Sequence, residues 1–152
     1  METTTSNNND VISDLIEINN DRVNGFEKAA EDLDANDTDL KAVFHKLAGE
    51  SRSNAAELRS IADLEADTNP GTSVLGAIHR AWIDVKATFT GNDRKSVLQE
   101  CERGEDAIKK AYRSALEDTN GLTQDVVATI SRQKQGIDAG HDQIKALRDS
   151  QA

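Results

Sequence analysis

The chain has 152 residues, of which 36% are hydrophobic, enough for one hydrophobic core but not for two. Its 28 acidic and 18 basic residues give a net charge of −10, which opposes binding to nucleic acid or to anionic lipid. The only cysteine excludes an intrachain disulfide, and no run approaches the ~18 apolar residues of a membrane span. Since the N-terminus also lacks a basic and apolar leader, we expect a cytoplasmic protein that binds neither nucleic acid nor membrane.

Two long helices are expected in the first part of the chain. Residues 1–9 are mostly Thr, Ser and Asn and predict a disordered tail, followed by a single domain over residues 10–149. From Asp10 to Leu33 the apolar residues recur at spacings of three and four, which is the helical period. After a short polar stretch, a second stripe of the same period runs from Leu40 to Ile61. Helices joined by so short a turn are expected to pack antiparallel.

The next connection is much longer. It holds the chain's only proline, Pro70, within a cluster of helix-breaking residues, and then a shorter amphipathic segment over residues 74–89 with the only tryptophan, Trp82. A bundle needs such a connection when its second and third helices run parallel, because the chain must cross the whole length of the bundle. We therefore predict a long crossover that contains a short helix.

Two further helices complete the pattern. The third is predicted from Arg94 to about Glu117, and the fourth carries its apolar face from Val126 to Leu147. No alternating run typical of a β-strand occurs in the sequence. The predicted fold is therefore all-α, a four-helix bundle.

A few polar residues fall on or beside the apolar stripes. Glu105 and Cys101 share the stripe of the third helix, so we expect Glu105 to point inward and Cys101 to pack as a small hydrophobe. One interpretation pairs Glu105 with His141 of the fourth helix by a hydrogen bond across the bundle. A second is a metal site, because Asp138 and His141 have the i, i+3 spacing from which helical bundles build such sites. Its candidate ligands, for one iron, manganese or zinc ion, are Glu50, Glu102, Glu105, Asp138 and His141.

Several segments resemble a known family. Gly76–Trp82, Glu100–Asp106 and His141–Asp149 together look like the bacterial family called domain of unknown function 2383, whose members are ferritin-like four-helix bundles. The resemblance covers nearly the whole chain. It implies a ferritin-like fold and no settled activity.

The resemblance also allows a comparison with the di-iron site of ferritins. That site takes one Glu from the first and third helices and a Glu-x-x-His pair from the second and fourth. Here Asn19 stands at the first-helix position, and Glu50 is followed three residues later by Ser53 instead of histidine. The resemblance therefore implies a degenerate di-iron site, for which ferroxidase chemistry is doubtful.

Three functions stay open at this point. The leading one is a non-catalytic ferritin-like bundle, stress-associated or binding an unknown protein partner, and the alternative is a metal-binding or oxidoreductase bundle that uses the five candidate ligands. The third is a homo-oligomer that assembles through the crossover, where Trp82 and Phe89 concentrate two of the chain's five aromatic residues. No phosphate-binding loop, nucleophile elbow or His-Glu-x-x-His motif occurs in the sequence, so hydrolase and nucleotide-dependent functions have no support.

Overall fold

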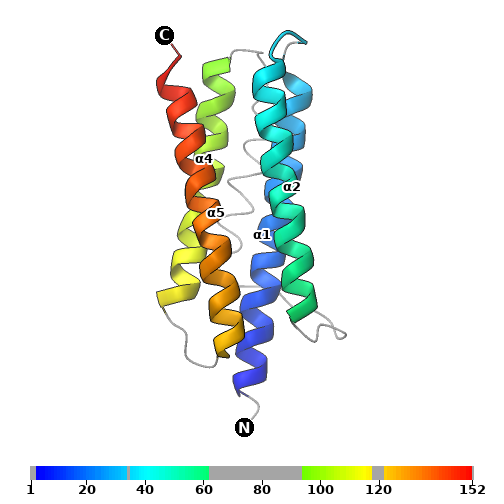
Figure 1. Cartoon of the computed structure of the whole chain (residues 1–152), viewed down its shortest axis with the longest axis vertical. Helices are drawn as coiled ribbons and strands as arrows, with labels where there is room; N and C mark the ends of the chain where they lie inside the picture. The colour runs from blue at the N-terminus through cyan, green and yellow to red at the C-terminus, as the bar shows by residue number, and fades with distance from the viewer. Residues whose placement is uncertain (1–2, 34, 62–93, 118–121, 152) are drawn as a thin grey trace.

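A computed structural model of the chain describes residues 3–33, 35–61, 94–117 and 122–151, with side chains from residue 11 onward. This part of the chain forms four helices and no strand, which confirms the predicted all-α four-helix bundle (Figure 1). The helices are α1 (Thr3–Asp32), α2 (Thr38–Ile61), α4 (Arg94–Glu117) and α5 (Gln124–Asp149). The predicted crossover helix, with Trp82, lies outside the described residues.

The order and direction of the helices follow the prediction. Helices α1 and α2 run antiparallel, as do α4 and α5, whereas α2 and α4 run in the same direction (Figure 1). Arg94, the first residue of α4, marks this parallel arrangement because it contacts the residues that begin α2. Its guanidinium donates to Asp37 Oδ1 at 2.8 Å and to Asp39 Oδ2 at 2.9 Å. These ion pairs therefore link the starts of α2 and α4 at one end of the bundle.

Helix α1 begins earlier than the sequence pattern predicted. It starts at Thr3 instead of Asp10, so residues 3–9, expected to belong to a disordered tail, are helical. Thr, Ser and Asn are weak helix formers, but extending a helix that has already formed is much easier than nucleating one.

The start of α5 is capped. This helix begins after Thr123, whose side chain accepts a hydrogen bond from the backbone N–H of Val126.

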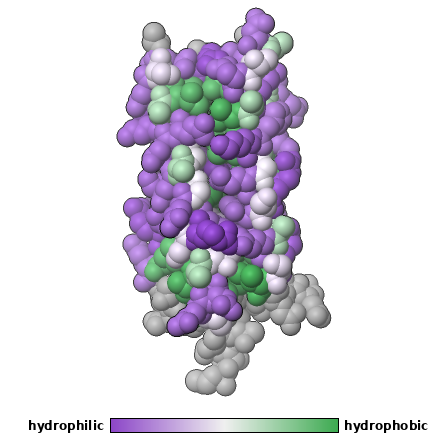
Figure 2. All heavy atoms as spheres, in the orientation of Figure 1, coloured by the Kyte–Doolittle hydropathy of each residue, from purple (hydrophilic) through white to green (hydrophobic). Residues whose placement is uncertain are grey.

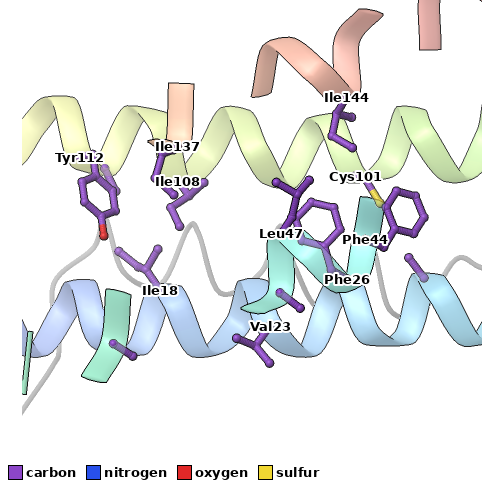
Figure 3. Close-up of a cluster of buried hydrophobic side chains, with 14 of the residues drawn as sticks. Ile18, Val23, Phe26, Phe44, Leu47, Cys101, Ile108, Tyr112, Ile137 and Ile144 are labelled. Carbon is purple, nitrogen blue, oxygen red and sulfur yellow. The ribbon is translucent and has the colours of Figure 1, made fainter. Parts of the chain in front are cut away.

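The buried hydrophobic residues form one cluster at the centre of the bundle. Figure 3 shows side chains from all four helices meeting there, among them Phe26, Phe44, Cys101, Ile108 and Ile137. The rings of Phe26 and Phe44 lie with their centroids 5.5 Å apart, and each fully buried side chain of this size contributes roughly 1.5–3 kcal/mol to stability. Cys101 is fully buried, as predicted, and burial raises the pKa of its thiol well above the ordinary value. It packs as an unreactive apolar residue.

One face of the bundle is predominantly polar. On the face shown in Figure 2, hydrophilic side chains cover most of the bundle, and hydrophobic ones show near its two ends. Among the described helices, none combines the length and the apolar character needed to cross a membrane.

Candidate functional site

A buried arginine lies at the centre of the polar interior. Arg22 of α1 has no exposed surface, and neither has Glu105 of α4. The guanidinium donates from Nε to Glu105 Oε1 at 2.6 Å and from Nη2 to Glu105 Oε2 at 2.9 Å. Both carboxylate oxygens are thus engaged by one planar donor, the bidentate geometry in which an arginine–carboxylate pair is strongest.

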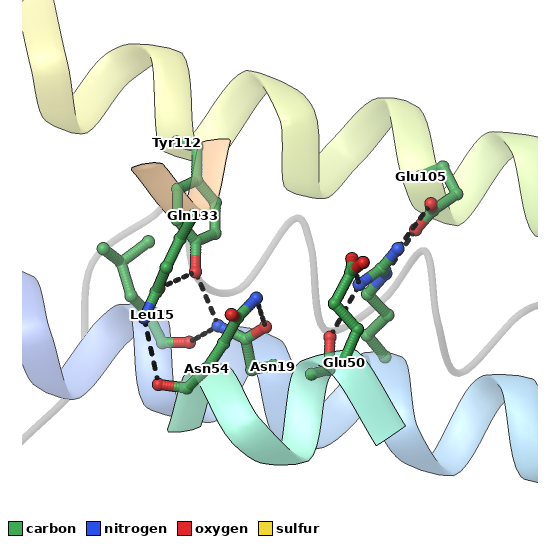
Figure 4. A network of polar contacts seen from close by, with 9 residues as sticks. Leu15, Asn19, Glu50, Asn54, Glu105, Tyr112 and Gln133 are labelled. Carbon is green, nitrogen blue, oxygen red and sulfur yellow. Dashed lines mark hydrogen bonds and ion pairs between the residues drawn. The ribbon is translucent and has the colours of Figure 1, made fainter. Parts of the chain in front are cut away.

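The other side of the guanidinium faces α2. Arg22 Nη1 donates to Glu50 Oε1 at 3.1 Å and to Ser51 Oγ at 2.9 Å. Figure 4 shows the carboxylates of Glu50 and Glu105 converging from α2 and α4 on the same region of the interior. The Glu50 side chain is 32% exposed, so this ion pair extends from the centre of the bundle to its edge. Arg22 therefore links three helices.

The charge of Arg22 is fixed by these contacts. Burial lowers its pKa, but the charges and hydrogen bonds of Glu105 and Glu50 raise it by more, so the net shift is upward. The aromatic face of Phe26 adds a favourable contact, since its ring centroid lies 5.4 Å from Arg22 Cζ. Arg22 is a permanent cation held by the bundle's own carboxylates.

Helix α5 packs against the buried ion pair at a glycine residue. A Cβ atom at Gly140 would lie 2.7 Å from Arg22 Nη2, 3.1 Å from Glu105 Oε2 and 3.2 Å from Leu47 Cδ2. One turn earlier, a Cβ atom at Gly136 would lie 3.6 Å from the Glu50 carboxylate, an ordinary contact. The absence of a side chain at residue 140 is what allows α5 to approach the buried ion pair.

A second polar layer lies alongside the first (Figure 4). The Tyr112 hydroxyl donates to Gln133 Oε1 at 2.7 Å and accepts from Asn19 Nδ2 at 2.8 Å, while Asn54 Nδ2 donates to Asn19 Oδ1 at 3.3 Å. Gln133 Nε2 donates in turn to Glu57 Oε1 at 2.8 Å, and this hydrogen bond is the main reason that the pKa of Glu57 lies below its ordinary value. Each of these buried polar groups has a protein partner.

The structure confirms one half of the predicted polar pair and corrects the other. Glu105 points inward, but its partner is Arg22 and not His141. His141 lies between two carboxylates at the edge of the bundle, with Nε2 2.5 Å from Asp106 Oδ1 and Nδ1 3.2 Å from Asp142 Oδ1. His141 is itself buried, but its imidazole faces Asp106 of α4 and not Glu105.

Arg22 was not among the residues predicted to face inward, because long basic side chains are usually solvated. A signal was nevertheless present. Arg22 stands four residues after Ile18 and four before Phe26, both fully buried, so it occupies the apolar stripe of α1. Its position on this stripe predicts that Arg22 points inward, just as the position of Glu105 on the stripe of α4 does.

The five predicted metal ligands fall into separate groups. Glu50 and Glu105 share the Arg22 guanidinium. Asp138 pairs with Lys134 on its own helix at 2.7 Å. Glu102 and His141 come together at the edge of the bundle with Asp106, which was not predicted, and one ligand atom from each lies within 4.8 Å of the others.

Comparison with known families agrees with the resemblance read from the sequence. The family described as Domain of unknown function (DUF2383) matches residues 7–118, a range that includes α2, α4 and nearly all of α1. No curated protein matches the chain.

Proposed function

We propose that this chain, a member of the DUF2383 family and so of a family without an assigned activity, is a non-catalytic ferritin-like bundle with a degenerate di-iron site. The observation that carries the proposal is the position of Arg22, whose guanidinium lies between the carboxylates of Glu105 and Glu50. A cation supplied by the chain itself occupies the region where the two carboxylates converge.

The use of the carboxylate oxygens supports this proposal. A dinuclear metal site needs several carboxylate oxygens with free lone pairs directed at the ions. Both oxygens of Glu105 accept hydrogen bonds from Arg22, and Oε1 of Glu50 accepts a third. A divalent ion at this position would have to displace those bonds and would be repelled at short range by a guanidinium that cannot lose its proton.

The first helix supports the same conclusion. Asn19, at the position where the ferritin comparison calls for a glutamate, is fully buried and engaged with Tyr112 and Asn54. An amide offers a metal ion no charge, and this one is already part of a hydrogen-bonded layer. The interior thus carries the helix-to-helix polar contacts that fix how the bundle packs, a use of buried polar groups known from other helical assemblies.

A bundle of this kind acts through its surface. The net charge of −10 favours a protein partner with a basic surface over an acidic one, because complementary charge speeds encounter and suppresses the wrong partners. We therefore infer a partner-binding role for the protein, with no reaction centre in the interior.

Iron loading tests the proposal directly. The full chain, purified without chelator, would be exposed aerobically to Fe(II), and bound iron would be counted by elemental analysis beside an active ferritin as positive control. We expect no pair of irons per chain and no acceleration of Fe(II) oxidation over buffer. Two irons per chain, bound with ferroxidase activity, would show the proposal to be wrong.

A further inference from the structure

We propose that Glu102, Asp106 and His141 form a second, independent site that binds one divalent transition-metal ion at the outer edge of α4 and α5. The proposal does not depend on the role of Arg22. It uses two of the residues predicted as ligands and adds Asp106, whose side chain is 61% exposed and opens the cluster to solvent.

The ligand atoms are close enough for one ion. Glu102 and Asp106 stand four residues apart on α4 and so share a face, and His141 reaches them from α5. One ligand atom from each residue lies within 4.8 Å of the other two, and His141 Nε2 is 2.5 Å from Asp106 Oδ1. Binding of a zinc ion at about 2.0–2.2 Å from each atom would require side-chain rotation, first of the exposed Asp106, which would give up its hydrogen bond with His141.

The chemistry of the donors indicates which ion they select. An imidazole nitrogen with two carboxylate oxygens suits Zn²⁺, Fe²⁺ or Mn²⁺ better than Ca²⁺ or Mg²⁺, which prefer oxygen ligands alone. Three protein ligands also leave a tetrahedral ion one position for water.

The orientation of His141 is a separate observation in favour of a metal. Its side chain is only 9% exposed, and Nδ1 lies 3.2 Å from Asp142 Oδ1. The 2.5 Å contact between Nε2 and Asp106 Oδ1 needs a proton between the two atoms. A metal ion would replace that proton, while Nδ1 donates to Asp142 as in the carboxylate–histidine–metal arrangement of known sites.

The charges around the imidazole favour the binding of a cation. They also include an arginine that would compete with a metal ion for Glu102. Three carboxylates, those of Glu102, Asp106 and Asp142, lie around the imidazole. Arg148 is an opposing cation in contact with Glu102, with Nη1 2.5 Å from Glu102 Oε1, and it also pairs with Asp149, where Nη2 is 2.8 Å from Oδ1. The charges of Lys109 and Lys145 act on Asp142. An incoming metal ion would take Glu102 from Arg148, so removing that arginine should strengthen metal binding.

Calorimetric titration of the full chain, free of any histidine tag, with zinc chloride tests the site. We expect one zinc ion per chain. His141→Asn should abolish binding, and Asp106→Asn and Asp142→Asn should each weaken it by about tenfold or more. Arg148→Gln should tighten it by about threefold, since an exposed ion pair competes only weakly. If the cluster had only a structural role, Arg148→Gln would not tighten zinc binding while the other substitutions weaken it.

Two matched controls keep the test specific. Asp138→Asn removes a nearby carboxylate that pairs with Lys134, and His45→Asn removes an exposed histidine on α2, so both should leave zinc affinity unchanged. No saturable zinc binding by the wild-type chain would overturn the site, as would an Asp138→Asn effect equal to that of Asp106→Asn. Neither result would bear on the proposed function, which fails if two irons bind per chain with ferroxidase activity.

Discussion

Gly140 of α5 lies against the guanidinium of Arg22 so closely that a Cβ atom at residue 140 would be 2.7 Å from Nη2. The end of an arginine side chain usually moves aside easily. Here it cannot, because four hydrogen bonds to Glu105, Glu50 and Ser51 hold it in place. The buried ion pair and the glycine on the facing helix therefore depend on each other.

The first prediction concerns the two glycines of α5. Gly140→Ala should lower the free energy of unfolding by about 1–3 kcal/mol, since overpacking displaces the ion pair. Gly136→Ala, whose new Cβ would make only an ordinary contact at 3.6 Å, should be neutral or stabilising by up to about 1 kcal/mol through helix propensity. Urea denaturation followed by circular dichroism measures both. Equal effects of the two substitutions would contradict the role assigned to Gly140.

The second prediction concerns the buried ion pair itself. Arg22→Met leaves the Glu105 carboxylate buried without its partner and should destabilise the bundle by about 3–5 kcal/mol. The double variant Arg22→Met/Glu105→Leu removes both charges and should recover most of that loss. A double-mutant cycle by denaturant unfolding gives the coupling. If the double variant lost as much stability as the two single variants together, the coupling energy between Arg22 and Glu105 would be zero.

The third prediction concerns acid stability at the end of the bundle where Arg94 contacts the α1–α2 turn. The hydrogen bond from Arg94 lowers the pKa of Asp39 from 3.8 to about 2. Between these values the unfolded chain binds more protons than the folded one, so stability rises with pH. The contribution of Asp39 is complete above about pH 4 and is lost as the pH falls toward 2.

The comparison with Asp39→Asn isolates this contribution. The variant should be less stable than wild type at neutral pH, and the difference should shrink as the pH falls through that window. Thermal unfolding at a series of pH values measures it. A difference that stayed constant down to pH 2 would mean that the carboxylate of Asp39 does not titrate as described.

The fourth prediction uses the only tyrosine in the chain. Burial raises the pKa of Tyr112, and the hydrogen bond from Asn19 opposes this shift without cancelling it. Its phenol should stay protonated in the folded protein at pH values where a free tyrosine ionises, about 10 and above. Since the folded pKa is the higher one, the stability contributed by Tyr112 is full below that range and is lost as the pH rises further.

Ultraviolet absorbance of tyrosinate follows this residue without interference from another tyrosine. We expect no ionisation near pH 10 until the bundle unfolds, and ordinary ionisation of the same chain in denaturant. Native protein that titrates near pH 10 would place the Tyr112 hydroxyl in contact with water.

The local pattern of the sequence was sufficient for much of the fold. Helical periodicity predicted α2, α4 and α5 closely, because each helix buries one apolar face whatever its neighbours are. The length of the connection between α2 and α4 predicted that these two helices run parallel. The start of α1 was predicted too late, since its polar first turns carry no apolar period.

In the candidate site too, the sequence determined some features and the tertiary structure determined others. Glu105 and Cys101 were placed inside by the sequence alone, because their position on a stripe is a property of one helix. Only the tertiary structure decided that Glu105 meets Arg22 while His141 turns to Asp106. Periodicity gives the face of a helix but neither its rotation against its neighbours nor its position along the bundle, and those two quantities determine which side chains share a level and become partners.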